Sequence, residues 1–141
     1  MLGKYLANVR AAHPLVHSIT NYVTVNDVAN AILAIGASPI MSDEPADVED
    51  ITSICNGLNL NIGTLNQRSI QGMHAAGRKA RELGNTILFD PVSAGASGLR
   101  TSTATSLMDE VHPDVIRGNL LPRATIITPN RPEAKCSSAR P

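Results

Sequence analysis

Two hydrophobic periods alternate along the chain. Apolar residues that recur every three or four positions predict helices, whereas short continuous apolar runs predict buried strands. The first pattern predicts helices over 2–12, 25–35, 44–55, a segment from 64 or 66 to 83, and 101–110. The second predicts strands over 37–41, 58–62, 86–89 and 115–119. The polar stretch 13–21 predicts an irregular or extended segment. Because strands alternate with helices across short loops, the sequence predicts an α/β fold with a parallel sheet covered by helices.

Residues with known terminal preferences mark the ends of several helices. Gly36 and Gly84 follow apolar helical faces and are expected to close those helices in the left-handed conformation. Thr24 and Asp43 are expected to cap the N-termini of the helices that follow them. The broad apolar face of 25–35 predicts a helix that packs against a large surface.

Each predicted strand ends in a polar or glycine-bearing turn, at 41–43, 62–64, 90–91 and 117–119. Ligands bind outside the carboxyl ends of parallel strands, and these ends share one edge of the sheet. Asp90 directly follows the apolar run and precedes Pro91 and a loop of small residues. A carboxylate followed by a loop with exposed amides suits a metal ion and a phosphate.

Composition and charge exclude several kinds of partner. The 141 residues are about one domain in length, and 12 basic residues balance 12 acidic ones, so no basic field attracts nucleic acid or an anionic membrane. Two Tyr, one Phe and no Trp leave few rings for stacking on bases. No apolar stretch approaches the ~20 residues of a membrane span, so we expect a cytoplasmic protein. Cys55 and Cys136 predict neither a disulfide framework nor a zinc site.

Five motifs occur in the order and approximate spacing of one enzyme family: His17-Ser-Ile-Thr-Asn-Tyr-Val, Ala34-Ile-Gly-Ala-Ser-Pro-Ile-Met41, Leu60-Asn-Ile-Gly-Thr-Leu65, Asp90-Pro-Val and Val115-Ile-Arg-Gly-Asn119. On these motifs, residues 1–119 resemble the hydroxyethylthiazole kinases. The resemblance implies a ribokinase-like fold, truncated here to about its N-terminal half. It also implies homotrimers with sites between subunits, and transfer of phosphate from ATP, with Mg²⁺, to the hydroxyl of 4-methyl-5-(2-hydroxyethyl)thiazole in thiamine salvage.

The resemblance assigns binding roles to four residues and a catalytic role to none. It places Met41 against the thiazole with Asn21 as a nearby polar contact, Arg117 on the ATP phosphates, and Asp90 in the magnesium and phosphate region. A thioether suits a small sulfur-containing ring, a guanidinium offers phosphate paired donors, and a carboxylate suits Mg²⁺. Structural alternatives stay open for all four: ordinary core packing, local backbone hydrogen bonding, a salt bridge and a turn cap.

His17 is a candidate general base, but no acid stands at a spacing that would orient its ring. We therefore expect it to make a structural hydrogen bond. Ser93 stands where the family usually carries Gly, which would stiffen the loop after Asp90 if that position needs a positive φ.

The sequence changes character after residue 119. Pro122 stands where the family has the Glu of an Asn-x-x-Glu element that helps to organise magnesium. Residues 120–134 instead resemble the hydroxymethylpyrimidine (phosphate) kinases, including their own Asn130-x-x-Glu133. We predict a partial kinase domain over 1–134 and an unpatterned tail over 135–141.

Two further functions compete with thiazole phosphorylation. The first is a catalytically silent fragment that retains a ligand-binding or subunit-contact surface. In the thiazole kinases the glycine-rich oxyanion loop and the residue that activates the hydroxyl follow the segment present here, so we expect little turnover. The second is phosphorylation of a pyrimidine alcohol, which rests only on residues 120–134.

Overall fold

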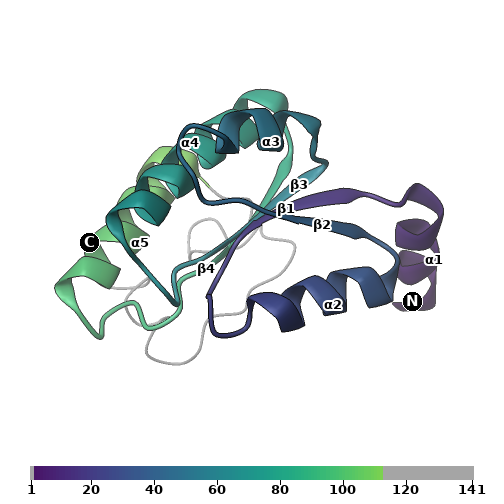
Figure 1. Cartoon of the computed structure of the whole chain (residues 1–141), viewed down its shortest axis with the longest axis horizontal. Coiled ribbons are helices and arrows are strands. Elements are labelled where there is room, and N and C mark those ends of the chain that lie inside the picture. The colour runs from purple at the N-terminus through teal and green to yellow at the C-terminus, as the bar shows by residue number, and fades with distance from the viewer. Residues whose placement is uncertain (1, 113–141) are drawn as a thin grey trace.

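The computed structural model describes residues 2–112 and shows a parallel sheet of four strands covered by helices (Figure 1). The elements are α1 (Leu2–Ala12), β1 (Leu15–Ile19), α2 (Val25–Ile35), β2 (Ser38–Met41), α3 (Val48–Ile54), β3 (Gly57–Asn61), α4 (Gln67–Leu83), β4 (Thr86–Asp90) and α5 (Gly98–Val111). The strand order is β2-β1-β3-β4, and all three neighbouring pairs are parallel. The predicted α/β class is confirmed.

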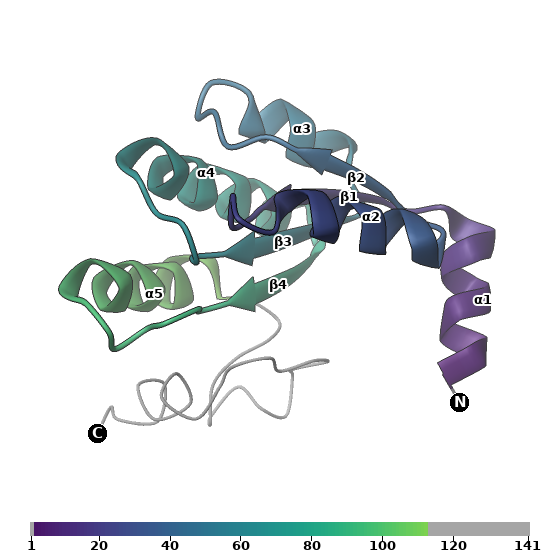
Figure 2. The same cartoon turned by 60° about the horizontal axis from the view of Figure 1, so that its bottom comes forward.

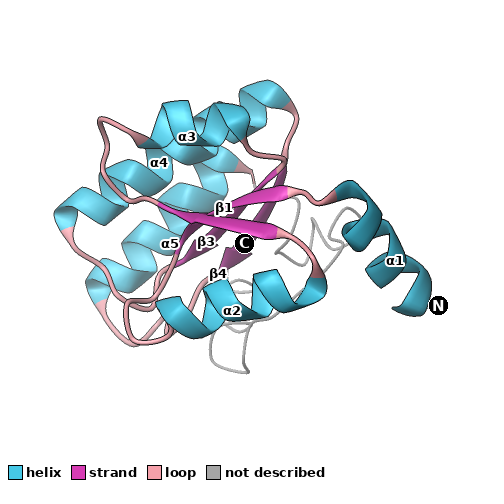
Figure 3. Cartoon of the chain, turned by 45° about the vertical axis from the view of Figure 1, so that its right-hand side comes forward, coloured by secondary structure: helices cyan, strands magenta, loops and turns pink. Residues whose placement is uncertain are grey.

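The sheet separates two unequal helical layers. Helices α3, α4 and α5 cover one face, and α2 lies on the other face beside β2 (Figures 1 and 3). Alternate residues of β3 and β4 point into the larger layer, where Leu58, Leu60, Ile87 and Phe89 are buried. This alternation follows from the two-residue period of a strand. The core therefore lies between the sheet and helices α3, α4 and α5.

Local chemistry explains the helix ends that the sequence predicted. Gly36 and Gly84 close α2 and α4 with φ of 99° and 71°, which confirms both as left-handed caps. At the start of α4, the Asn66 side chain accepts from the backbone N–H of Ser69, and the Ser69 hydroxyl accepts from the backbone N–H of Asn66. These reciprocal bonds satisfy two donors that a helix start leaves without partners.

Two local predictions differ from the structure, and one alternative is decided by it. The segment predicted as irregular or extended is extended, because it contains β1, which pairs with both β2 and β3. Helix α3 begins at Val48 after a turn, so Asp43 does not cap it and instead accepts a hydrogen bond from Tyr22. Thr24 precedes α2 but makes no side-chain capping bond. For Asp43, the long-range contact with Tyr22 outweighs the local capping preference.

Helix α2 also differs from its prediction. It was expected to pack against a large surface, but it has no buried residue in the structure, and Leu33 and Ile35 are 55% and 45% exposed. Its contacts are mainly with β2. None of the helices in residues 2–112 combines the length and apolar character that crossing a membrane requires.

Candidate functional site

The carboxyl ends of the four strands lie along one edge of the sheet. Figure 2 shows the arrowheads of β2, β3 and β4 pointing to the same side, away from α1. Met41 ends β2 and Asp90 ends β4, so the structure brings both residues to this edge, as the sequence predicted. Because β1 and β3 lie between them, the two positions are separated by three strand spacings, or about 14 Å.

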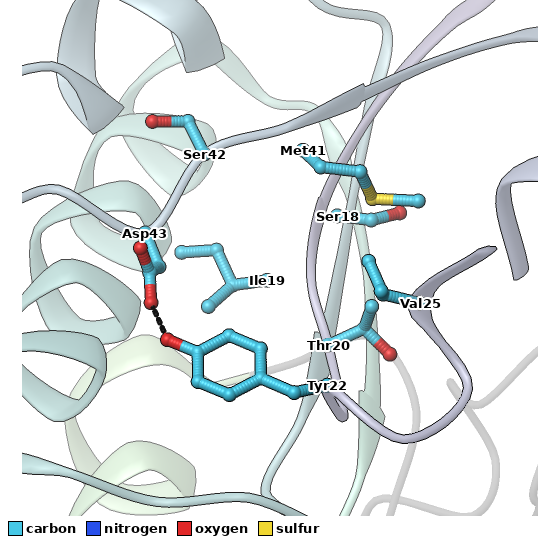
Figure 4. Close-up of a pocket in the computed structure, with 8 residues that line it drawn as sticks. All are labelled: Ser18, Ile19, Thr20, Tyr22, Val25, Met41, Ser42 and Asp43. Atoms are coloured by element: carbon cyan, nitrogen blue, oxygen red, sulfur yellow. Dashed lines mark hydrogen bonds between the residues drawn. The ribbon is translucent and has the colours of Figure 1, made fainter.

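A small pocket of about 100 Å³ opens at this edge beside the ends of β1 and β2 (Figure 4). Its lining consists of Ser18, Ile19, Thr20, Tyr22, Val25, Met41, Ser42 and Asp43. Three of these side chains are apolar, and the others bring hydroxyl groups and one carboxylate. Such a mixture suits a small, partly polar organic molecule.

Tyr22 and Asp43 bound the pocket from two different loops. Figure 4 shows the Tyr22 ring extending to Asp43, where its hydroxyl donates to Oδ2. Asn66 Nδ2 lies 3.4 Å from the same hydroxyl, and Arg68 Nη2 lies 3.5 Å from Asp43 Oδ1. These contacts connect the loop before α2, the loop after β2 and the start of α4. Sequence reasoning missed this group because no local pattern relates its members.

His17 fixes the loop that carries Ser42 and Asp43. The ring is fully buried, with Nε2 2.9 Å from the Ser42 carbonyl oxygen and Nδ1 2.9 Å from Thr52 Oγ1. A carbonyl oxygen only accepts, so Nε2 carries the proton and donates. Burial lowers the pKa of His17, although the Ser42 carbonyl and the nearby Asp47 act in the opposite direction. A neutral ring with a structural hydrogen bond agrees with the prediction.

Asn21 lies at the same edge and bridges two loops. Its Oδ1 accepts from the backbone N–H of Val23 and from the Thr64 hydroxyl, both at close range (2.9 and 2.8 Å). Its amide nitrogen lies against Gly63, where an added Cβ would collide with it. The side-chain oxygen therefore has a structural role, while the predicted contact with the thiazole stays a prediction.

Asp90 accepts a 2.8 Å hydrogen bond at Oδ2 from Asn61 Nδ2 on the neighbouring strand. The described residues contain no group of three or more His, Cys, Asp or Glu side chains arranged to hold a metal ion. One carboxylate is nevertheless compatible with Mg²⁺, which keeps several waters and takes its remaining ligands from phosphate groups. Asp90 is therefore compatible with the predicted magnesium and phosphate region as a single protein ligand of the metal.

The loop after Asp90 differs from the expected loop of exposed amides. The N–H groups of Ala94 and Ala96 donate to the Pro91 and Ser93 carbonyls, and Gly95 donates to the Thr101 hydroxyl. These three N–H groups therefore donate to acceptors in the loop and at the start of α5. Ser93 has a φ of 60°, so this position does adopt the positive φ for which Gly is favoured.

Arg100 organises this edge and was missed by sequence reasoning. Its Nη1 donates to the Ile62 carbonyl oxygen at 2.6 Å and to that of Val92 at 3.2 Å, and its Nη2 donates to that of Gly63 at 2.8 Å. The guanidinium therefore ties the end of β3 to the loop after β4. Every residue carries a backbone carbonyl, so the sequence alone does not indicate which carbonyls accept from Arg100.

Five residues singled out in the sequence lie outside the described part of the chain: Arg117, Pro122, Asn130, Glu133 and Cys136. The strand predicted over 115–119 also lies outside it.

A parallel sheet with helices on both faces, and with polar side chains and a pocket at its carboxyl edge, defines an α/β protein of the kind that binds small ligands at that edge. Comparison with known proteins then identifies the family. A model of the hydroxyethylthiazole kinase family matches residues 6–128, so the chain belongs to this family.

Individual relatives agree with this assignment. The chain is 58% identical over 120 residues to the hydroxyethylthiazole kinase of Clostridium acetobutylicum and 56% identical over 119 residues to that of Clostridium beijerinckii. These matches cover 85% and 84% of this chain but 44% and 43% of the relatives. The solved structure of the hydroxyethylthiazole kinase protein from Pyrococcus horikoshii OT3 is 36% identical, with a TM-score of 0.75 over 92% of this chain and 46% of that one.

The chain therefore spans less than half the length of the curated relatives that it matches. The family match also continues past residue 119 to residue 128, and so includes part of the segment that resembles the pyrimidine kinases.

Proposed function

We propose that this protein is a hydroxyethylthiazole kinase, which transfers the terminal phosphate of ATP to the hydroxyl of 4-methyl-5-(2-hydroxyethyl)thiazole in thiamine salvage. The family match supports the reaction class. The observation that carries the proposal to this chain is the pocket beside Met41, at the edge where parallel sheets bind ligands.

The proposed roles divide the edge between the two substrates. Met41 and Asn21 would contact the thiazole, and Asp90 would hold Mg²⁺ near the phosphates about three strand spacings away. Arg117, outside the described residues, binds the ATP phosphates. This separation leaves room for an alcohol side chain and a triphosphate to meet between the two ends, which in-line phosphoryl transfer requires.

The chain's own residues would act by positioning and by excluding water. Met41, Val25 and Ile19 provide the apolar surface for a ring, while the Tyr22–Asp43 contact closes one side of the pocket. Bound Mg²⁺ would neutralise charge on the transferred phosphate. Arg100 would keep the ends of β3 and β4 in register, because it joins three of their backbone carbonyls.

We also propose a homotrimer in the cytoplasm, as the family resemblance implies. The exposed apolar residues Leu33 and Ile35 of α2 offer a surface that a neighbouring subunit could cover. Light scattering on the purified chain tests this assembly: a mass three times that of the 14.9 kDa monomer supports it, and a monomer at high concentration contradicts it.

The function is tested by two measurements on the purified chain. Isothermal calorimetry measures binding of the thiazole alcohol, and mass spectrometry measures the phosphorylated alcohol formed with ATP and Mg²⁺. We expect binding and slow product formation in the original chain, in line with the little turnover predicted from the sequence, and no product from Asp90→Asn. Absence of binding contradicts the proposal. Binding without product also contradicts it and supports the silent fragment instead.

A further inference from the structure

Ser18 carries a buried hydroxyl that lacks a hydrogen-bond partner. The residue is only 2% exposed, and within residues 2–112 its Oγ is one of few buried side-chain atoms without a partner. Leaving a buried hydroxyl unpaired is unfavourable, so each such group in a folded protein calls for an explanation. A ligand that supplies the missing partner is one explanation.

The position of Ser18 points to a ligand. The residue lines the pocket at the end of β1 and pairs in register with Met41 of β2. Residues paired across parallel strands point to the same side of the sheet, so the two side chains are neighbours there. Figure 4 shows the Met41 thioether beside the Ser18 hydroxyl. By contrast, the adjacent His17 points to the opposite face and has partners at both ring nitrogens.

The environment of the hydroxyl limits what its partner can be. The nearest pocket walls from β2 and α2 are Met41 and Val25, which offer no conventional hydrogen-bonding group. The partner must therefore be a polar atom of a molecule that is otherwise apolar enough to lie against these side chains. A heteroaromatic ring with one acceptor nitrogen has this character. Met41 is only partly buried, and its unbranched side chain can move aside to bring the hydroxyl into contact with the pocket.

We infer that Ser18 is a specificity-determining residue, whose hydroxyl donates a hydrogen bond to the ring nitrogen of a bound azole alcohol. This inference rests on the proposed function and adds to it the group that distinguishes an azole from an apolar ring of the same shape. The bond also sets which way the ring faces, and hence where its hydroxyethyl arm points. Ser18 takes no part in the chemical step.

The test compares two ligands in two proteins by calorimetry at neutral pH. The ligands are the thiazole alcohol and its thiophene analogue, in which CH replaces the ring nitrogen. We expect the original chain to bind the thiazole about tenfold more tightly, in line with one net hydrogen bond. In Ser18→Ala the thiazole should lose this advantage, while the affinity for the thiophene should stay the same. Retention of the tenfold preference in Ser18→Ala overturns the inference.

Two controls separate this role from a structural one. Ser53→Ala removes an exposed hydroxyl of α3 that bonds to the Glu49 carbonyl, and it should leave both affinities unchanged. In the absence of ligand, Ser18→Ala should not lower the urea midpoint, because the hydroxyl has no partner to lose. A clearly lowered midpoint contradicts the inference. If the original chain binds neither ligand, the proposed function itself fails, which is a different result from equal binding of both.

Discussion

Single buried polar groups hold the candidate site together. His17 and Thr52 lie under the loop that carries Ser42 and Asp43, and each is completely buried. Thr52 Oγ1 lies 2.6 Å from the Val48 carbonyl oxygen and 2.9 Å from His17 Nδ1, so its single proton can be donated to one of these two acceptors at a time, and the residue joins α3 to β1. Hydrogen bonds in such surroundings are costly to break, because the remaining partner stays buried without water.

The titration of His17 predicts how stability depends on pH. Burial lowers the pKa of His17 in the folded chain below the ordinary value of 6.5, so the unfolded chain binds the extra proton first as pH falls. Stability should therefore decrease below about pH 6.5, by at most ~1.4 kcal/mol per pH unit, until the folded histidine also protonates. Urea unfolding between pH 7.5 and 5 measures this dependence.

The matched variant for this prediction is His17→Gln. It should be less stable than the original chain at pH 7.5, but the part of the pH dependence that His17 causes should be absent. A difference in unfolding free energy between the two chains that does not change with pH would show that His17 does not titrate between the two states.

Thr52→Val tests the buried hydroxyl directly. The change keeps the shape of the side chain and removes the partner of His17 Nδ1, so we expect a loss of about 1–3 kcal/mol in the free energy of unfolding. Ser53→Ala is the matched control, because its hydroxyl also bonds to the carbonyl four residues earlier on α3 but is exposed. The control should change stability by less than about 0.5 kcal/mol. Equal losses in both variants would contradict the role given to Thr52.

At the scale of whole elements, the site depends on how closely α4 approaches the loop after β2. Gly72 of α4 is buried, and a Cβ at this position would lie 2.6 Å from the backbone oxygen of Asp43. No flexible side chain can absorb such a contact. The absence of a side chain at Gly72 therefore sets the position of Asp43, and with it one wall of the pocket.

Gly72→Ala should consequently weaken both the fold and the pocket. Overpacking should lower the free energy of unfolding by about 1–3 kcal/mol. The higher helix propensity of alanine offsets roughly 1 kcal/mol of this at most, so we expect a net loss of stability. Thiazole binding should weaken as well. Gly98→Ala at the start of α5 is the control, because a Cβ there meets nothing within 4 Å and should leave stability unchanged or improved. Unchanged stability in Gly72→Ala would refute the contact.

The sequence predicted the helices and strands better than the long-range contacts between their side chains. Periodic apolar residues were sufficient for α2, α4, β3 and β4, because these segments follow a single period. They did not decide between an irregular and an extended segment for β1, because the buried polar residues His17 and Ser18 interrupt the apolar pattern of a central strand. The carboxyl edge could be predicted from where the strands end. The partners of Arg100 and the Tyr22–Asp43 contact could not, because they depend on backbone carbonyls and on residues brought together only by folding.

At the scale of the whole molecule, the described residues form one layered sheet with an apolar helix, α2, that is largely exposed. The family match extends over most of the chain, while the matched relatives are more than twice as long as the aligned segment. The proposed contacts with the alcohol, at Met41 and Asn21, lie within the described residues. The proposed ATP contact at Arg117 lies outside them. Binding of the alcohol is therefore the property that tests the proposed site within the described residues.

The central claim is that the alcohol binds at Met41, and methyl NMR of labelled methionines tests it most directly. Met73 and Met108 are buried in the core and serve as internal references. On addition of 4-methyl-5-(2-hydroxyethyl)thiazole, the Met41 methyl signal should shift and reach saturation, while those of Met73 and Met108 stay in place. A Met41 signal that does not move at millimolar ligand, or that moves only together with the two core signals, would contradict the account.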